Sequence, residues 1–172
     1  MKHLCLVILL VFTLSCKSEN TAVTQKNSEL NSIVCPENGV CSFKVLQNKS
    51  LAIKTDGLGD LFLETVEGKK LVLKFEYSKN HDKKLEDGSY REEVFLELNP
   101  NDLKIETKDL VNQKLYFARW CYCKGETGYY KIKEGLLKVE KLNDGSFQLY
   151  LSFKIGEVPQ VVTQINETFS LQ

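Results

Sequence analysis

The chain has 172 residues, and its 23 basic and 23 acidic side chains give a formal net charge of zero at pH 7. Lysine and glutamate are interspersed, so the chain lacks the basic stripe of a nucleic-acid-binding protein, and nucleic acid is not expected as a partner. With two histidines and one methionine, it also lacks the residues from which most zinc and copper sites are built.

The first fifteen residues have the layout of a bacterial lipoprotein signal peptide. Lys2 and His3 form a short basic start, and the apolar run from Leu4 to Phe12 is too short to span a bilayer as a helix. Small and hydroxyl residues then lead to Cys16. This pattern predicts that residues 1–15 are removed and that the Cys16 sulfur is acylated, with palmitate as a typical chain, so that lipid anchors the protein in a membrane.

Two other outcomes are compatible with this start. A typical lipobox has an aliphatic residue three places before the cysteine and then two small residues, whereas here only Ser15 fits well, after Thr13 and Leu14. Thr13 and Ser15 would also suit an ordinary signal peptidase, which would release a secreted protein, and an uncleaved anchor is the third outcome. We favour lipidation because Cys16 stands at the end of the apolar run, outside any plausible core. Cys5 would leave with the signal.

Residues 16–32 are predicted to be a flexible tether that follows the lipidated cysteine. The stretch is polar and almost free of large apolar residues, so it cannot bury enough surface to offset the entropy lost on ordering. With about 16 residues, it would reach roughly 20–25 Å. Lys17 followed by Glu19 resembles the start of surface-exported lipoproteins in Bacteroidota. We therefore expect the protein in the cell envelope, at the outer membrane, on either its periplasmic or its surface face.

Residues 33–172 are expected to form a single β-rich extracytoplasmic domain. Apolar side chains recur at every second position in three segments: 71–77, 94–98 and 147–155. Such alternation is typical of strands with one buried face. The segment 141–147 is the clearest hairpin, and only 101–113 could hold a short helix. We predict an all-β fold of about eight to ten short antiparallel strands, arranged as a sandwich or a partly closed barrel and stapled by disulfides.

Four cysteines of this domain form two close pairs, Cys35 with Cys41 and Cys121 with Cys123. In an oxidising compartment, an even set of this kind predicts two disulfides. If 120–124 is a strand, the Cα atoms of Cys121 and Cys123 lie about 6.5–7 Å apart, at the limit of a disulfide. We therefore favour cross-pairing between the two pairs, without choosing between its two versions. The alternative is a local Cys35–Cys41 loop that leaves Cys121 and Cys123 as a dithiol or a strained bond.

The alternative pairing supports a second functional hypothesis. Two thiolates on one face of a strand can ligate Cu(I) or exchange disulfides with a partner. Most copper carriers add Met or His, but Met1 and His3 would leave with the signal, and His81 alone would remain. A thiol-redox or soft-metal carrier that uses Cys121 and Cys123 is therefore the alternative hypothesis, and neither a resident metal nor a cofactor is predicted.

The sequence shows no recognisable catalytic constellation. His81 lies in a polar hairpin tip, without a second histidine for a zinc cluster or a catalytic triad in the mature chain. Asp60, Glu64 and the pair Glu92-Glu93 could supply carboxylates, but nothing aligns two of them across a cleft. We interpret Glu92-Glu93 as the start of a strand with one wet side, and 56–60 as a hairpin turn instead of a calcium loop. The chain is not expected to be an enzyme.

Aromatic residues are densest between Phe117 and Tyr130, around the second cysteine pair. This stretch is compatible with a central strand followed by a hairpin, in which both faces are covered. The functional interpretation is a partly exposed aromatic platform of Trp120, Tyr122 and Tyr129 with Arg119 beside it, suited to stacking on a sugar or a partner protein. We take these four residues as the candidate binding surface.

Three groups of residues carry a resemblance to a known family. They are Cys35-Pro36 with Gly39 and Cys41, the turn Asp87-Gly88-x-Tyr90-x-Glu92, and Trp-Cys-Tyr-Cys-Lys-Gly-x-Thr-Gly-Tyr-Tyr at 120–130. Together they resemble uncharacterised small lipoproteins of the Bacteroidota, of the Flavobacteriia type. The resemblance implies an envelope address and a disulfide framework. We expect a lipid-anchored envelope lipoprotein that serves as a binding or structural module, with an envelope protein or a glycan as its partner.

Overall fold

A computed structural model describes residues 35–81 and 87–171 of the chain. The predicted signal peptide, the predicted acylation site Cys16 and the predicted tether lie outside the described residues. Among the residues it describes, no helix could cross a membrane.

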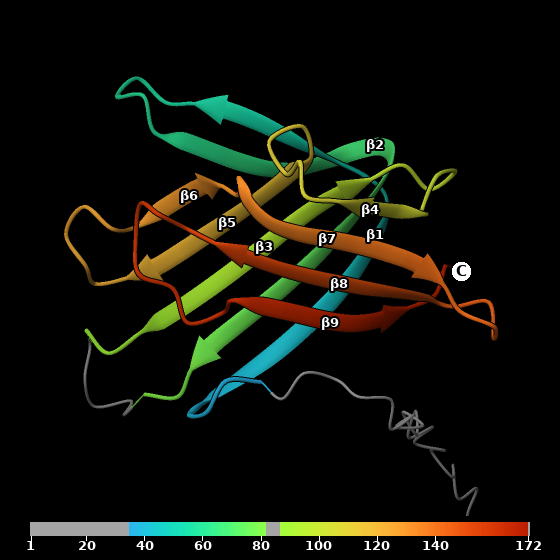
Figure 1. Cartoon of the computed structure of the whole chain (residues 1–172). Coiled ribbons are helices and arrows are strands. Elements are labelled where there is room, and N and C mark those ends of the chain that lie inside the picture. Colours follow the sequence, from blue (N-terminus) through green and yellow to red (C-terminus); the bar gives the residue numbers. More distant parts are fainter. Residues whose placement is uncertain (1–34, 82–86, 172) are drawn as a thin grey trace, which may run out of the picture.

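Nine β-strands make up the regular structure of the described residues, and they form two antiparallel sheets (Figure 1). The strands are β1 (Gly39–Thr55), β2 (Leu61–Lys79), β3 (Tyr90–Leu98), β4 (Ile105–Thr107), β5 (Lys114–Cys121), β6 (Gly128–Lys131), β7 (Glu134–Lys141), β8 (Phe147–Lys154) and β9 (Gln164–Phe169). One sheet has the order β1-β2-β3-β5-β6 and the other β4-β7-β8-β9. The sheets are not closed into a barrel, so the all-β prediction is confirmed in its sandwich form.

The main core lies between the two sheets. Side chains at alternate positions of β2 and β8 point into it, including Leu71, Leu73, Leu149 and Leu151. This is the burial that the period of two predicts, because successive side chains of a strand point to opposite faces. The ring of Phe117 is packed at 6.0 Å from that of Phe153, which carries the contact from one sheet to the other.

Two local predictions have different outcomes. The 141–147 hairpin is confirmed: β7 ends at Lys141, β8 begins at Phe147, and Gly145 adopts a φ of 87° in the turn between them. The short helix that 101–113 could hold does not form, since that segment contains turns and the short strand β4. Its apolar residues Leu103 and Leu110 have the seven-residue spacing of a helical face, but they reach the main core from the irregular segments on either side of β4, which pairs with β7.

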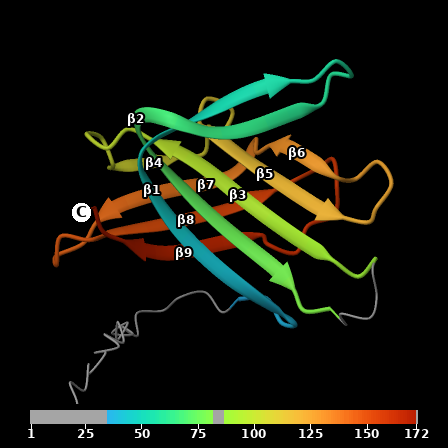
Figure 2. The same cartoon turned by 180° about the vertical axis from the view of Figure 1, so that it is seen from behind.

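The first two strands are much longer than the short strands that were predicted, at 17 and 19 residues. Their register shifts between Gln47 and Lys49, and Asn48 adopts a φ of 57°, as expected at a β-bulge. Beyond the bulge, the distal half of the hairpin turns across the outer face of the five-stranded sheet (Figure 2). Leu51 and Leu63 from this part pack with residues of β2, β3 and β5 in a second, smaller apolar cluster.

Candidate functional site

Both disulfides are local, and the predicted cross-pairing is wrong. Cys35 is bonded to Cys41 with the Cα atoms 5.7 Å apart, and Cys121 to Cys123 with the Cα atoms 5.2 Å apart. Cys123 lies beyond the end of β5, so the chain turns there and brings the two Cα atoms closer than in a strand. Cross-pairing is also prevented by distance, because β2 and β3 separate β1 from β5, which places them about 14 Å apart.

The four residues of the predicted aromatic platform do not all lie on one surface. Trp120 and Tyr129 lie together on the outer face of the five-stranded sheet, with ring centroids 5.2 Å apart in an edge-to-face arrangement. Arg119 points to the opposite face and is only 6% exposed, as the alternation of a strand requires. Tyr122 lies past the end of β5 and is 80% exposed. The structure thus brings two of the four together.

Phe62 is a third aromatic residue of this outer face that sequence reasoning missed. It comes from the distal half of the β1–β2 hairpin and lies edge-to-face with Tyr129 at 6.5 Å between ring centroids. Its side chain remains 46% exposed. The bulge at Asn48 that brings Phe62 here is seen in the register of the two strands, and the residues around Phe62 do not indicate which distant strand the hairpin covers. We call Phe62, Trp120 and Tyr129 the outer aromatic face.

The buried carboxylate of Glu93 contacts the outer aromatic face through Trp120. Glu93 is 4% exposed, accepts a hydrogen bond of 2.5 Å from Trp120 Nε1, and forms an ion pair of 2.5 Å with Lys74 Nζ. Desolvation lowers the pKa of Lys74, but hydrogen bonds to Glu93 and Glu76 outweigh it, so the net effect is a raised pKa. Lys74 therefore stays charged and balances the charge of Glu93. The hydrogen bond from Trp120 to Glu93 holds the orientation of the indole.

A cavity of about 330 Å³ opens beside Trp120. It is lined by Ser78, Lys79, His81, Ser89, Tyr90, Arg91 and Trp120. The guanidinium of Arg91 lies over the Trp120 ring, 5.9 Å from its centroid, and 3.9 Å from Glu93. Among the described residues that line this cavity, the charged ones are basic and none is a carboxylate.

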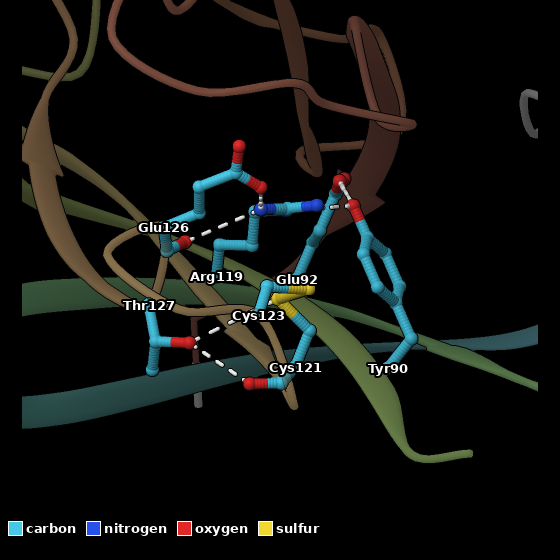
Figure 3. Close-up of a disulfide and its surroundings, with 7 residues drawn as sticks. All are labelled: Tyr90, Glu92, Arg119, Cys121, Cys123, Glu126 and Thr127. Carbon is cyan, nitrogen blue, oxygen red and sulfur yellow. Dashed lines mark hydrogen bonds and ion pairs between the residues drawn. A yellow bond between two sulfur atoms is a disulfide. The ribbon is translucent and has the colours of Figure 1, made fainter. Parts of the chain in front are cut away.

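On the opposite face of β3 and β5, which points to the second sheet, the polar side chains of Tyr90, Glu92 and Arg119 form a network. Glu92 is 0% exposed, and its carboxylate accepts hydrogen bonds of 2.7 Å from the backbone N–H groups of both Val161 and Val162. The Tyr90 hydroxyl also donates to Glu92, and Arg119 Nε donates to the Tyr90 oxygen at 3.3 Å (Figure 3). Glu92 thus connects β3 to the loop between β8 and β9.

The prediction that Glu92-Glu93 lies at the start of a strand is confirmed by β3, but the prediction that one side of it is wet is wrong. Glu92 faces the second sheet, and Glu93 faces the indole of Trp120, so both carboxylates are buried. Burial of charge is costly unless the group is paired and hydrogen-bonded, and each of these two is satisfied by partners distant in sequence. Those partners could not be read from the residues around position 92.

Tyr90 makes the stability of the protein sensitive to alkaline pH. Burial and the hydrogen bond to Glu92 raise the pKa of Tyr90 to about 12, although Arg119 acts in the opposite direction. The folded state therefore holds this proton more tightly than the unfolded chain, where the pKa of tyrosine is about 10. The stabilisation is complete below about pH 10 and is lost as the pH rises towards about 12.

We expect Tyr90→Phe to reduce the alkaline loss of stability. The free energy of unfolding, measured by urea denaturation at about pH 9 and about pH 11, should fall less between the two conditions in the variant than in the wild type. Tyr77, Tyr129 and Tyr130 also have raised pKa values, mainly through burial, and they remain in both proteins as an internal control. An identical fall in both proteins would contradict the assignment to Tyr90.

The Cys121–Cys123 disulfide lies next to this network at the end of β5 (Figure 3). Thr127 donates a hydrogen bond of 2.9 Å to the Cys121 carbonyl, and its oxygen lies 3.8 Å from Cys121 Sγ. Arg119 forms an ion pair of 2.6 Å with Glu126 in the same turn. These contacts hold the β5–β6 turn in place around the disulfide.

No group of three or more His, Cys, Asp or Glu side chains within 35–81 and 87–171 is arranged to hold a metal ion. His81, the one histidine in these ranges, lines the cavity beside Trp120. Comparisons with models of known protein families, with curated proteins and with solved structures give no match for the chain.

Proposed function

We propose that the protein is a lipid-anchored lipoprotein of the cell envelope whose sandwich domain binds acidic saccharides beside Trp120. The signal-like start, Cys16 and the polar tether support the anchor. The basic cavity next to the indole of Trp120 supports the ligand class and is the observation that carries this proposal.

The chemistry of the cavity suits a sugar that bears a carboxylate. An indole offers a flat apolar surface for the apolar face of a sugar ring, while a few polar groups set the orientation of the ligand. Arg91 and Lys79 can form charge-assisted hydrogen bonds with a carboxylate, and these are stronger than neutral ones. The serine hydroxyls of Ser78 and Ser89 add donors and acceptors for sugar hydroxyl groups.

Two carboxylates, Glu93 and Glu76, lie near Arg91, but each is paired more closely with another group. Glu93 is engaged by Lys74 at 2.5 Å and by the Trp120 N–H, and Glu76 is engaged by Lys74 at 3.1 Å, whereas Arg91 lies farther from Glu93, at 3.9 Å. The Arg91 side chain is also 46% exposed, so its guanidinium can turn towards a ligand. The outer aromatic face continues this surface with Tyr129 and Phe62.

The fluorescence of Trp120 provides a direct test, because it is the single tryptophan of the chain. We expect a saturable change in emission when full-length protein in detergent is titrated with oligogalacturonate, and little change with a neutral oligosaccharide of equal length. Arg91→Ala should weaken the binding of the acidic ligand roughly tenfold to hundredfold, since a hydrogen bond to a charged group contributes about 1.5–3 kcal/mol.

Lys154→Ala is the matched control, because Lys154 is an exposed cation at the end of β8 in the other sheet. It should leave the dissociation constant unchanged. Equal responses to the acidic and the neutral oligosaccharide, or equal affinities of the Arg91 and Lys154 variants, would contradict the proposed ligand class.

A further inference from the structure

The Cys121–Cys123 disulfide contributes little to holding the fold together. It links residues two positions apart within one turn, so it restricts the unfolded chain far less than a bond between distant segments. Cys35 and Cys41 pack against the main core, whereas neither core cluster of the described residues includes Cys121 or Cys123. Stabilisation of the fold is therefore an incomplete explanation for the Cys121–Cys123 bond.

The bond is accessible from solvent. It lies where β5 ends and the turn to β6 begins, at a projecting end of the five-stranded sheet (Figure 1). The residue between the two cysteines, Tyr122, is 80% exposed. A surface cavity of about 380 Å³ is lined by Cys121, Tyr122, Cys123 and Lys124. A thiol from another molecule can approach the bond without any opening of the fold.

The surroundings distinguish the two sulfur atoms. Cys121 Sγ has the Thr127 hydroxyl at 3.8 Å, and the single proton of this hydroxyl, which is donated to the Cys121 carbonyl in the oxidised protein, can turn to a thiolate that forms at Cys121. Cys123 is flanked by the exposed residues Tyr122 and Lys124. Lys124 follows Cys123 directly and lines the same surface cavity, so its positive charge attracts an anionic nucleophile to this side of the bond. Cys123 is thus the sulfur open to attack, and Cys121 is the better-supported leaving group.

We propose that Cys121–Cys123 is a thiol–disulfide exchange site that accepts two electrons from the dithiol of a partner protein. This exchange does not require a ligand in the saccharide-binding cavity, although the two sites adjoin at Tyr90 and Trp120. A thiolate of the partner attacks Cys123 Sγ, a mixed disulfide forms, and the bond to Cys121 breaks, so that Cys121 leaves as a thiolate. The second partner thiolate then attacks the partner's own sulfur in the mixed disulfide and releases Cys123. The partner ends as a disulfide, and its two protons end on Cys121 and Cys123.

The test compares the two disulfides within one molecule. Oxidised full-length protein is incubated with reduced thioredoxin or with reduced glutathione at equal thiol concentration, quenched with acid, alkylated and mapped by peptide mass. We expect Cys121 and Cys123 to become alkylated at least about tenfold faster than Cys35 and Cys41, with unchanged circular dichroism. Thioredoxin should act faster than glutathione, because its second thiol resolves the mixed disulfide.

Reduction of both disulfides at one rate, or reduction of Cys121–Cys123 only after unfolding, would overturn the proposal. A faster reaction with glutathione than with thioredoxin would overturn the partner-dithiol assignment.

The role of Thr127 has its own pair of variants. Thr127→Val should slow the reduction of Cys121–Cys123 roughly twofold to tenfold, which corresponds to the loss of one hydrogen bond. Thr55→Val changes an exposed threonine at the end of β1 and should leave the rate unchanged. Equal rates in the two variants would overturn the assignment of Cys121 as the leaving sulfur.

Discussion

Replacing Glu92 with alanine is expected to lower the free energy of unfolding by about 2–6 kcal/mol. The substitution removes the acceptor of the Val161 and Val162 N–H groups, each held at 2.7 Å. A buried donor left without a partner costs about 1–3 kcal/mol, which applies to the Val162 N–H, whereas the bonds from the Val161 N–H and the Tyr90 hydroxyl are part-buried and each contributes about 0.5–1.5 kcal/mol. The Tyr90 hydroxyl would lose its acceptor as well. Urea denaturation followed by circular dichroism measures the change.

Two further variants make this prediction specific to the carboxylate. Glu92→Gln keeps the shape and one acceptor oxygen but sets an amide N–H₂ group against one backbone donor, so its stability should fall between those of wild type and Glu92→Ala. It also serves as the measurable variant if the alanine protein does not fold. Glu134→Ala removes an exposed glutamate at the start of β7 and should change stability by less than about 0.5 kcal/mol. If both Glu92→Gln and Glu92→Ala are as stable as the wild type, the proposed role of Glu92 as the carboxylate that connects β3 to the loop between β8 and β9 is contradicted.

The position of Glu92 explains why the effect should be large. The loop between β8 and β9 is closed from within by Gln160, whose side chain accepts from the Ile155 N–H and donates to the Val162 carbonyl. Glu92 holds the same loop from the opposite sheet. Loss of this carboxylate would therefore loosen one end of the sandwich while the apolar contacts between the sheets remain.

Under the proposed lipid anchor, Cys16→Ser is expected to move the protein from the membrane fraction to the soluble fraction almost completely. A serine hydroxyl cannot take the place of the cysteine sulfur in lipoprotein acylation. Each buried methylene contributes about 0.8 kcal/mol to membrane binding, so several acyl chains give a stable anchor and their loss removes it. Fractionation of cells and intact mass of the purified protein measure the two consequences.

Cys5→Ser is the matched control for the anchor, because Cys5 lies inside the predicted signal and would be removed with it. The control protein should stay in the membrane fraction and carry the same added acyl mass as the wild type. A soluble wild-type protein without acyl mass would contradict the lipid anchor and favour simple secretion. Membrane association that persists in Cys16→Ser would favour an uncleaved anchor.

Much of the strand pattern was predictable from the sequence because side-chain alternation is a local property. The buried stripe of β8 and the turn at Gly145 depend on residues within one hairpin, and both were found where the sequence predicted them. The opposite orientations of Arg119 and Trp120 follow from the same period of two. The exact ends of strands were less certain, and the end of β5 at Cys121 changed the disulfide pairing.

The sequence by itself determined the signal-like start, the all-β class and the adjacency of Trp120 to the second cysteine pair, because each depends on neighbours along the chain. Only the tertiary structure decided that Glu92 and Glu93 are buried and that Phe62 joins Tyr129. It also decided that Arg91 lies over Trp120 in a basic cavity. The physical reason is that burial and charge pairing depend on which strands become neighbours, and strand alternation sets only the face on which a side chain lies.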